Sequence, residues 1–329
     1  MAAPPSWRTG DLRISIWPLN AAGTGGPYRA SSSSARRAIH SGSLHVTHRE
    51  RGKILRGIDV ISPTFFTLAV IGYVCATGLA LAYLVQRQDL IYRLGSLATL
   101  AAWACHSLAL AIRGIEQGRP PFASLTEAVS VAVWVVVLLE MWAERHYNVR
   151  VLGAFVLPVA VMLSMSAVGR SLEGPAIDRA LSGAWLWVHI GLALIGIAAF
   201  VLNFAGAVMY LLQERALKAK RPGTFYYRLP SLETLDRLTY RTLALGFPFL
   251  TTGLLLGALW ARRVWGSVFA FDPLAMFSFV AWIIYAATLA GRAAGGWHGR
   301  RAAYFAIIGF AALVLTLGAG FLLPGRHGS

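Results

Sequence analysis

The residues best suited to binding chemistry gather in segment 259–273, which lies between two long apolar runs. It holds four large aromatic side chains, two arginines and an Asp-Pro pair: Trp260, Arg262, Arg263, Trp265, Phe269, Phe271 and Asp272-Pro273. Aromatic residues also collect at membrane interfaces, and that alternative explains one or two of the four rings. A large, flat, amphipathic ligand would use all of them, because rings supply apolar walls and arginines pair with acidic groups.

Three histidines are candidate iron ligands. His189 lies near the start of one apolar run, His327 follows the last run, and His106 lies inside another. Haem iron commonly takes axial imidazoles, the haem ring needs apolar walls, and its propionates need arginine or backbone donors. His189 and His327 are therefore candidate axial ligands, with a hydrogen-bonding role at a helix end as the alternative for each. His106 is either a relay ligand or a neutral histidine bonded to a helix carbonyl, since ionisable groups at such depth face the bundle interior or a pathway.

The composition predicts an integral membrane protein. The chain is 57% hydrophobic and 13% charged, with a mean hydropathy of +0.59, whereas soluble domains carry roughly 25% charged residues. Most Lys and Arg lie between apolar runs or in the N-terminal tail, so the net charge of +16 indicates membrane orientation and no nucleic-acid partner. Cys75 and Cys105 form no CxxC pair, which gives no support to a thiol-redox or zinc site.

We predict an all-α fold, a polytopic bundle of about eight transmembrane helices in residues 60–329. Residues 1–59 are basic and rich in Ser and Gly, and we expect this tail to be disordered because it buries too little apolar surface. Most of the predicted helices are close to the ~20 residues that cross ~30 Å of hydrocarbon, and the fifth is clearly longer. The predicted helices are 61–86, 91–113, 124–143, 150–168, 184–213, 241–260, 272–291 and 302–323.

The distribution of basic residues predicts the orientation. Connectors after odd-numbered helices carry about twice as many Lys and Arg as those after even-numbered ones, so we place the odd connectors in the cytoplasm. The basic tail then lies outside, which conflicts with the same rule, but long N-terminal segments obey it poorly. His189, His327 and segment 259–273 consequently share the outer surface. Leucines at every third position in 229–238 further predict a short amphipathic helix on the cytoplasmic face.

Several short motifs follow one another in a fixed order, at 187–196, 210–215, 257–261, 265–267, 272–273, 296–303 and 323–327. In this order they resemble the cytochrome c assembly family, and the nearest type is CcsA/ResC of the system II pathway. The likeness runs from about Ser107 to the C-terminus. It implies that His189 and His327 match two external haem-ligating histidines and that Trp265–Pro273 matches the tryptophan-rich haem-binding motif.

The chain departs from the family pattern at four positions. Phe269 and Phe271 replace two tryptophans of the motif, Ala275 replaces its acid, and Ala290 stands where the family has a transmembrane histidine. External haem binding is thus compatible with the sequence, while haem passage through the membrane by the family's route is in doubt.

The resemblance implies a protein of the bacterial inner membrane that binds haem b non-covalently and presents it to apocytochrome c. A ResB/CcsB-like membrane subunit, apocytochrome c and membrane lipid are the implied partners. The protein would form no covalent bond itself, so we expect a subunit of a haem-ligation complex and not a classical enzyme. The alternative is a HemX-like, non-catalytic regulator or scaffold in haem metabolism. A small-molecule transporter is a third hypothesis. The chain lacks the paired inverted repeats expected of one, which argues against it.

Overall fold

The computed structural model describes residues 48–167, 184–219, 227–266 and 272–322. Every regular element in those ranges is a helix, which confirms the predicted all-α class. The helices are α1 (His48–Gln86), α2 (Asp89–Gln117), α3 (Leu125–Tyr147), α4 (Gly153–Ala167), α5 (Ala184–Lys218), α6 (Leu232–Trp265), α7 (Pro273–Ala294) and α8 (Arg300–Leu322).

Seven of these helices are long and apolar enough to cross a membrane, namely all except α4. α4 has 15 residues, which corresponds to about 22 Å at 1.5 Å per residue. It is therefore shorter than the predicted helix 150–168. α1 begins at His48, inside the predicted tail, and the division of the chain at residues 59 and 60 stays a prediction.

Local capping explains where several helices begin. The Ser124 side chain accepts from the Glu127 backbone N–H at 3.2 Å, and the Glu127 carboxylate accepts from the Ser124 backbone N–H at 3.3 Å. These two bonds form a capping box, which satisfies amide groups that the first turn leaves unpaired. At the start of α6 the Ser231 side chain alone accepts from the Thr234 N–H, at 3.3 Å. Asp272 followed by Pro273 starts α7.

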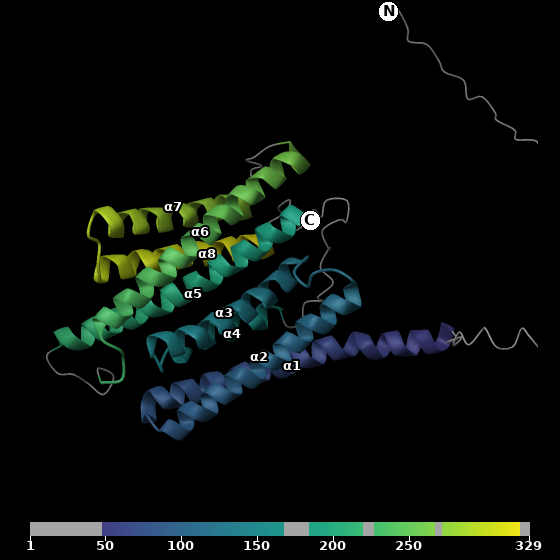
Figure 1. Ribbon diagram of the computed structural model, residues 1–329, viewed down its shortest axis with the longest axis horizontal. Coiled ribbons are helices and arrows are strands. Elements are labelled where there is room, and N and C mark those ends of the chain that lie inside the picture. The colour runs from purple at the N-terminus through teal and green to yellow at the C-terminus, as the bar shows by residue number, and fades with distance from the viewer. Residues whose placement is uncertain (1–47, 168–183, 220–226, 267–271, 323–329) are drawn as a thin grey trace, which may run out of the picture. The chain divides into compact units, whose positions relative to one another are not determined.

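Successive helices of the bundle alternate in direction, which gives it two ends (Figure 1). The His189 end holds the starts of α3, α5 and α7 and the last turns of α2, α6 and α8. A Cβ on Gly320, in the last turns of α8, would lie 2.9 Å from Leu274 in α7 and 3.1 Å from Leu125 in α3. This close approach confirms that the three segments meet at one end.

The opposite end, here the Arg150 end, holds the corners between α1 and α2, α3 and α4, α5 and α6, and α7 and α8. Arg228, before α6, donates to the Leu84 carbonyl at 2.8 Å, and Arg87 donates to the Arg228 carbonyl at 3.3 Å. A partly buried ion pair closes the same end, where Asp236 Oδ2 lies 2.9 Å from Arg292 Nη2. Asp236 Oδ1 accepts from the Gly299 N–H at 3.1 Å.

The leucine-rich segment 229–238 does not form a separate surface helix, so that prediction is wrong. From Leu232 onward it is the first part of α6, which runs for 34 residues without a break. Leu229, Leu235 and Leu238 are buried in a core cluster with residues of α1, α3, α4 and α5. The leucine stripe is therefore covered by protein, and the apolar face reflects core packing.

Small residues bring α5 and α6 close together. A Cβ on Gly196 of α5 would lie 3.1 Å from the Leu250 backbone N, and a Cβ on Gly253 of α6 would lie 3.3 Å from the Ala193 backbone N. Helices in membranes associate through such small-residue contacts because lipid offers no hydrophobic driving force between them. The close packing fixes how α6 lies against the first turns of α5, where His189 is located.

Candidate haem-binding site

His189 lies in the second turn of α5 and contacts α6 with its imidazole. Its Nδ1 is 2.5 Å from the Gly253 backbone oxygen. Because a carbonyl oxygen only accepts, Nδ1 carries the proton and the ring's lone pair is on Nε2. Metal-ligating histidines usually have this arrangement, in which a donated N–H fixes the tautomer and the ring orientation.

Gly257 makes room for the imidazole. A Cβ at this position would lie 2.6 Å from Cε1 of His189 and 2.9 Å from its Nδ1, both well inside van der Waals contact. Gly253 and Gly257 are four residues apart and so face the same side of α6. One glycine supplies the acceptor for the imidazole and the next supplies the space for it.

Two residues predicted to lie in the connector after helix 241–260 are instead helical. Arg262 and Arg263 belong to the last turn of α6, which continues to Trp265 and ends at Gly266 with φ +73°. Trp260, the last residue of that predicted helix, lies in the same part of α6. Arg262 and Arg263 are exposed and Trp260 is half-buried. Two cations in the last turn also favour the helix itself, because they face the negative end of its dipole.

Asp272 has a structural role that accounts for its burial. Its carboxylate accepts from the Ala275 N–H at 3.3 Å and caps α7, and its side chain is buried. A direct contact of Asp272 with a cofactor stays a prediction. The side chains of Trp265, Phe269, Phe271 and His327 lie outside the described residues, and their predicted roles stay predictions too.

His106 is fully buried between α1, α2 and α3. Its Nδ1 lies 3.2 Å from the Tyr73 hydroxyl and its Nε2 lies 2.9 Å from the Ser130 hydroxyl. Phe66 packs edge-on against the ring with centroids 5.4 Å apart. These contacts favour the hydrogen-bonding alternative, with two side-chain hydroxyls in place of a helix carbonyl, and relay ligation by His106 stays a prediction. Iron ligation by His106 would require one of these two bonds to break.

A buried charge cluster at the His189 end was not predicted from the sequence. Glu127 lies 2.7 Å from Arg119 and 3.4 Å from Arg113. Close to this cluster, Phe122 meets Trp187 of α5 edge-on with ring centroids 5.4 Å apart. The sequence signal for the cluster was the capping-box spacing of Ser124 and Glu127, and nothing in the sequence pairs the two arginines with that carboxylate.

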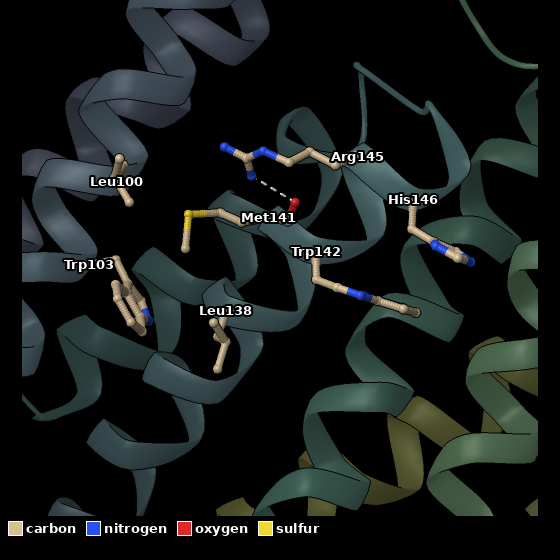
Figure 2. Close-up of a pocket in the computed structure, with 7 residues that line it drawn as sticks. All are labelled: Leu100, Trp103, Leu138, Met141, Trp142, Arg145 and His146. Carbon is tan, nitrogen blue, oxygen red and sulfur yellow. Dashed lines mark hydrogen bonds between the residues drawn. The ribbon is translucent and has the colours of Figure 1, made fainter.

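An apolar groove of about 570 Å³ lies between α2 and α3 and contains none of the predicted ligands. Figure 2 shows Trp103 of α2 on one side of it and Trp142 of α3 on the other, with Arg145 donating to the Met141 carbonyl. His146 stacks on Trp142 with ring centroids 4.7 Å apart. It belongs to the last turn of α3.

The fold defines a multi-pass, all-helical membrane protein, and comparisons with known proteins identify its family. Residues 122–327 match the model of the family described as cytochrome C assembly protein. The cytochrome c biogenesis protein CcsA of Gloeobacter violaceus is 30% identical, over 75% of this chain and 89% of that protein. CcsA of Guillardia theta is 28% identical, over 72% and 85%. The chain therefore belongs to the cytochrome c assembly protein family.

A solved structure shows the same fold. The cytochrome c haem lyase CcmF superposes with a TM-score of 0.56 at 21% sequence identity, covering 82% of this chain. The match covers 47% of CcmF, so this chain corresponds to about half of that larger protein. At this identity the likeness concerns the arrangement of helices alone.

Proposed function

We propose that this chain binds haem b non-covalently at the His189 end of the bundle and presents it to apocytochrome c. The chain is a membrane protein of cytochrome c biogenesis, as its family and its CcsA relatives indicate. Neither finding favours the HemX-like alternative. The observation that carries the proposal is the hydrogen bond from His189 Nδ1 to the Gly253 carbonyl.

The described residues fit a haem in three respects. His189 offers an imidazole whose tautomer and orientation are set by α6, with the lone pair on Nε2. Arg262 and Arg263 are exposed cations within two turns of the end of α6, suited to pair with propionates. Trp260 adds a half-buried ring one helical turn beyond the residue that accommodates the imidazole.

The remaining parts of the proposed site come from the family resemblance and from the alternation of the helices. α8 ends at Leu322, five residues before His327, and α8 ends at the same end of the bundle as His189. We assign His327 as the second axial ligand and Phe269 and Phe271 as walls of the haem. We also place this end on the periplasmic side of a bacterial inner membrane, because of the Lys and Arg distribution.

The proposed chemistry of the chain is binding and orientation. Haem supplies the vinyl groups that reduced apocytochrome cysteines attack. The chain holds the ring in one pose, so that the vinyls and the thiols meet in a defined geometry. A ResB/CcsB-like membrane subunit is the proposed partner. Because Ala290 stands where the family has a transmembrane histidine, the route by which haem arrives is not assigned to this chain.

The test is an absorption spectrum of the detergent-purified protein from haem-supplemented cells, followed by haem titration of the stripped protein. We expect a Soret band with low-spin features and saturable binding of one haem per chain. As a control, the variant His298→Ala should bind haem as the wild type does. His298 is an exposed histidine at the Arg150 end, and among the contacts described it bonds only to the nearby Gly296 carbonyl. Absence of haem from the wild-type protein in both measurements contradicts the proposal.

A further inference from the structure

Two glutamates of α3 are equally buried but have opposite surroundings. Glu127 and Glu140 are each 2% exposed. Glu127 has two arginine partners and accepts from two backbone N–H groups, at 3.0 Å from Ala123 and 3.3 Å from Ser124. Among the groups that the structure describes, Glu140 Oε2 is buried and has no hydrogen-bond donor. A buried charge without compensation is costly, so Glu127 can be ionised while Glu140 cannot be ionised at the same cost.

The nearest polar group to Glu140 is another carboxyl group. Glu144 follows one helical turn later on the same face of α3, and both side chains line the same small cavity. Tyr92 of α2 lines this cavity together with Glu144. Two ionised carboxylates are acceptors only, so a hydrogen bond between them requires one proton. Two like charges this close would also repel each other in an environment of low dielectric constant.

The neighbouring cations bond elsewhere. Arg145 donates to the Met141 carbonyl at 2.9 Å. Arg150 lies 3.1 Å from Asp89 and stacks over the Tyr92 ring at 5.0 Å. Tyr83 of α1 and Arg150 line the same cavity as the pair. These are the charged and titratable groups that α1, α2, α3 and the α3–α4 corner turn toward the pair, and no guanidinium among them bonds to Glu140.

The pair lines a small, partly open cavity with a volume of about 20 Å³. That is enough for one water molecule, which needs roughly 10–15 Å³. The lining includes Tyr83, Tyr92, Ser96 and Arg150 in addition to the two carboxyl groups. At the start of α4, Gly153 leaves the space that Glu140 occupies, because a Cβ there would lie 3.1 Å from Glu140 Oε1.

We propose that Glu140 and Glu144 form a one-proton binding site at the Arg150 end of the bundle. In its resting form one carboxyl group is protonated and donates to the other, so that the pair carries a single negative charge. The proton exchanges with a water molecule in the cavity: the O–H bond of the carboxylic acid breaks as a new O–H bond forms on water, and the reverse step returns the proton. Tyr92 and Arg150 connect this cavity to the surface at the α3–α4 corner.

The site is independent of the proposed haem site. It lies at the other end of α3 from the Glu127 cluster, and the contacts described for its residues do not include His189 or the end of α6. Its two carboxyl groups lie at positions i and i+4 of α3, a helix that is otherwise mostly apolar at this point. Such residues in a membrane helix are expensive and commonly serve proton transfer.

The first test is infrared spectroscopy of the purified full-length protein in H₂O and D₂O. We expect a carboxylic-acid C=O band that shifts in D₂O and disappears in the double variant Glu140→Gln, Glu144→Gln. Asp89→Asn is the matched control and should retain the band, because Asp89 is an exposed carboxylate paired with Arg150. Absence of the band from the wild type, or its persistence in the double variant, overturns the proposal.

The second test does not depend on the variants folding. Dicyclohexylcarbodiimide reacts with protonated carboxyl groups, and mass spectrometry of the labelled wild-type protein locates the adducts. We expect an adduct on Glu140 or Glu144 and none on Glu127, which is an internal control of equal burial with two arginine partners. Labelling of Glu127 alone, equal labelling of all three glutamates, or no labelling of the pair contradicts a shared proton.

Discussion

Replacement of Gly257 by alanine should weaken haem binding without removing any proposed ligand. The new methyl group would lie 2.6 Å from Cε1 of His189, whereas carbon atoms in contact prefer about 3.5–4.0 Å. The imidazole must therefore move by about 1 Å. Its Nδ1 is 2.5 Å from the Gly253 carbonyl oxygen, so a movement of that size stretches the bond beyond a good hydrogen-bond distance.

The expected magnitude follows from the bond that is lost. A hydrogen bond of this kind contributes about 0.5–1.5 kcal/mol. Loss of a group that orients a metal ligand typically lowers affinity about 10- to 100-fold. We therefore expect haem affinity of Gly257→Ala to fall at least tenfold, as measured by titration of the stripped protein and followed at the Soret band.

Gly191→Ala provides the control for this measurement. Gly191 lies two residues after His189 on α5, and a Cβ there would have no neighbour within 4 Å. This variant adds the same methyl group to the same helix pair and should bind haem as the wild type does. If Gly257→Ala also keeps wild-type affinity and an unchanged spectrum, the contact between α6 and the imidazole does not orient an iron ligand.

Three further outcomes follow from the structure and the orientation. Ser231→Cys should be labelled by a membrane-impermeant thiol reagent only from the cytoplasmic side, and labelling from outside would reverse the orientation. Phe269→Ala and Phe271→Ala should each lower haem retention roughly ten- to hundredfold, since burial of one such ring contributes ~1.5–3 kcal/mol; a double variant with wild-type haem content would leave the rings as an interface belt. Arg292→Leu breaks a partly buried pair, in which Arg292 is 4% and Asp236 24% exposed, and should destabilise the fold by more than the ~1 kcal/mol of an exposed pair. Arg237→Ala breaks an exposed pair and should cost less than about 1 kcal/mol, as measured for both variants by thermal unfolding. Equal decreases in unfolding temperature would mean that the Arg292–Asp236 pair stabilises the fold no more than an exposed pair does.

The sequence predicted the helices well because their signal is local. Apolar runs of about 20 residues between basic connectors mark membrane spans whatever their neighbours are. Alternation along the chain then predicts which helix ends lie together, and the contacts of Gly320 with Leu274 and Leu125 confirm this. The long fifth helix was also predicted, from the length of its apolar run.

Errors arose where a pattern has two physical explanations. The leucines of 229–238 indicate one apolar face, but only the tertiary structure shows that protein covers it. Arg262 and Arg263 were assigned to the connector because the composition of segment 259–273 suits a ligand. No helix breaker occurs between Ala258 and Trp265, however, and the helix continues to Gly266.

The supporting contacts of the site had no sequence signal at all. The imidazole of His189 and the carbonyl of Gly253 are 64 positions apart, and any small residue on a neighbouring helix would have looked equivalent. The same holds for Tyr73 and Ser130 around His106. The carboxyl groups at 140 and 144 did have a signal, since two acids one turn apart in an apolar run are unusual.

The most direct test of the account is the spectrum of His189→Gly with and without added imidazole. If His189 is an axial ligand, the variant should show a five-coordinate, high-spin iron, and free imidazole should restore the low-spin spectrum by occupying the vacated position. A His189 that only holds α5 against α6 would give a different result. Its loss would lower the unfolding temperature, the haem spectrum would stay that of the wild type, and imidazole would change nothing.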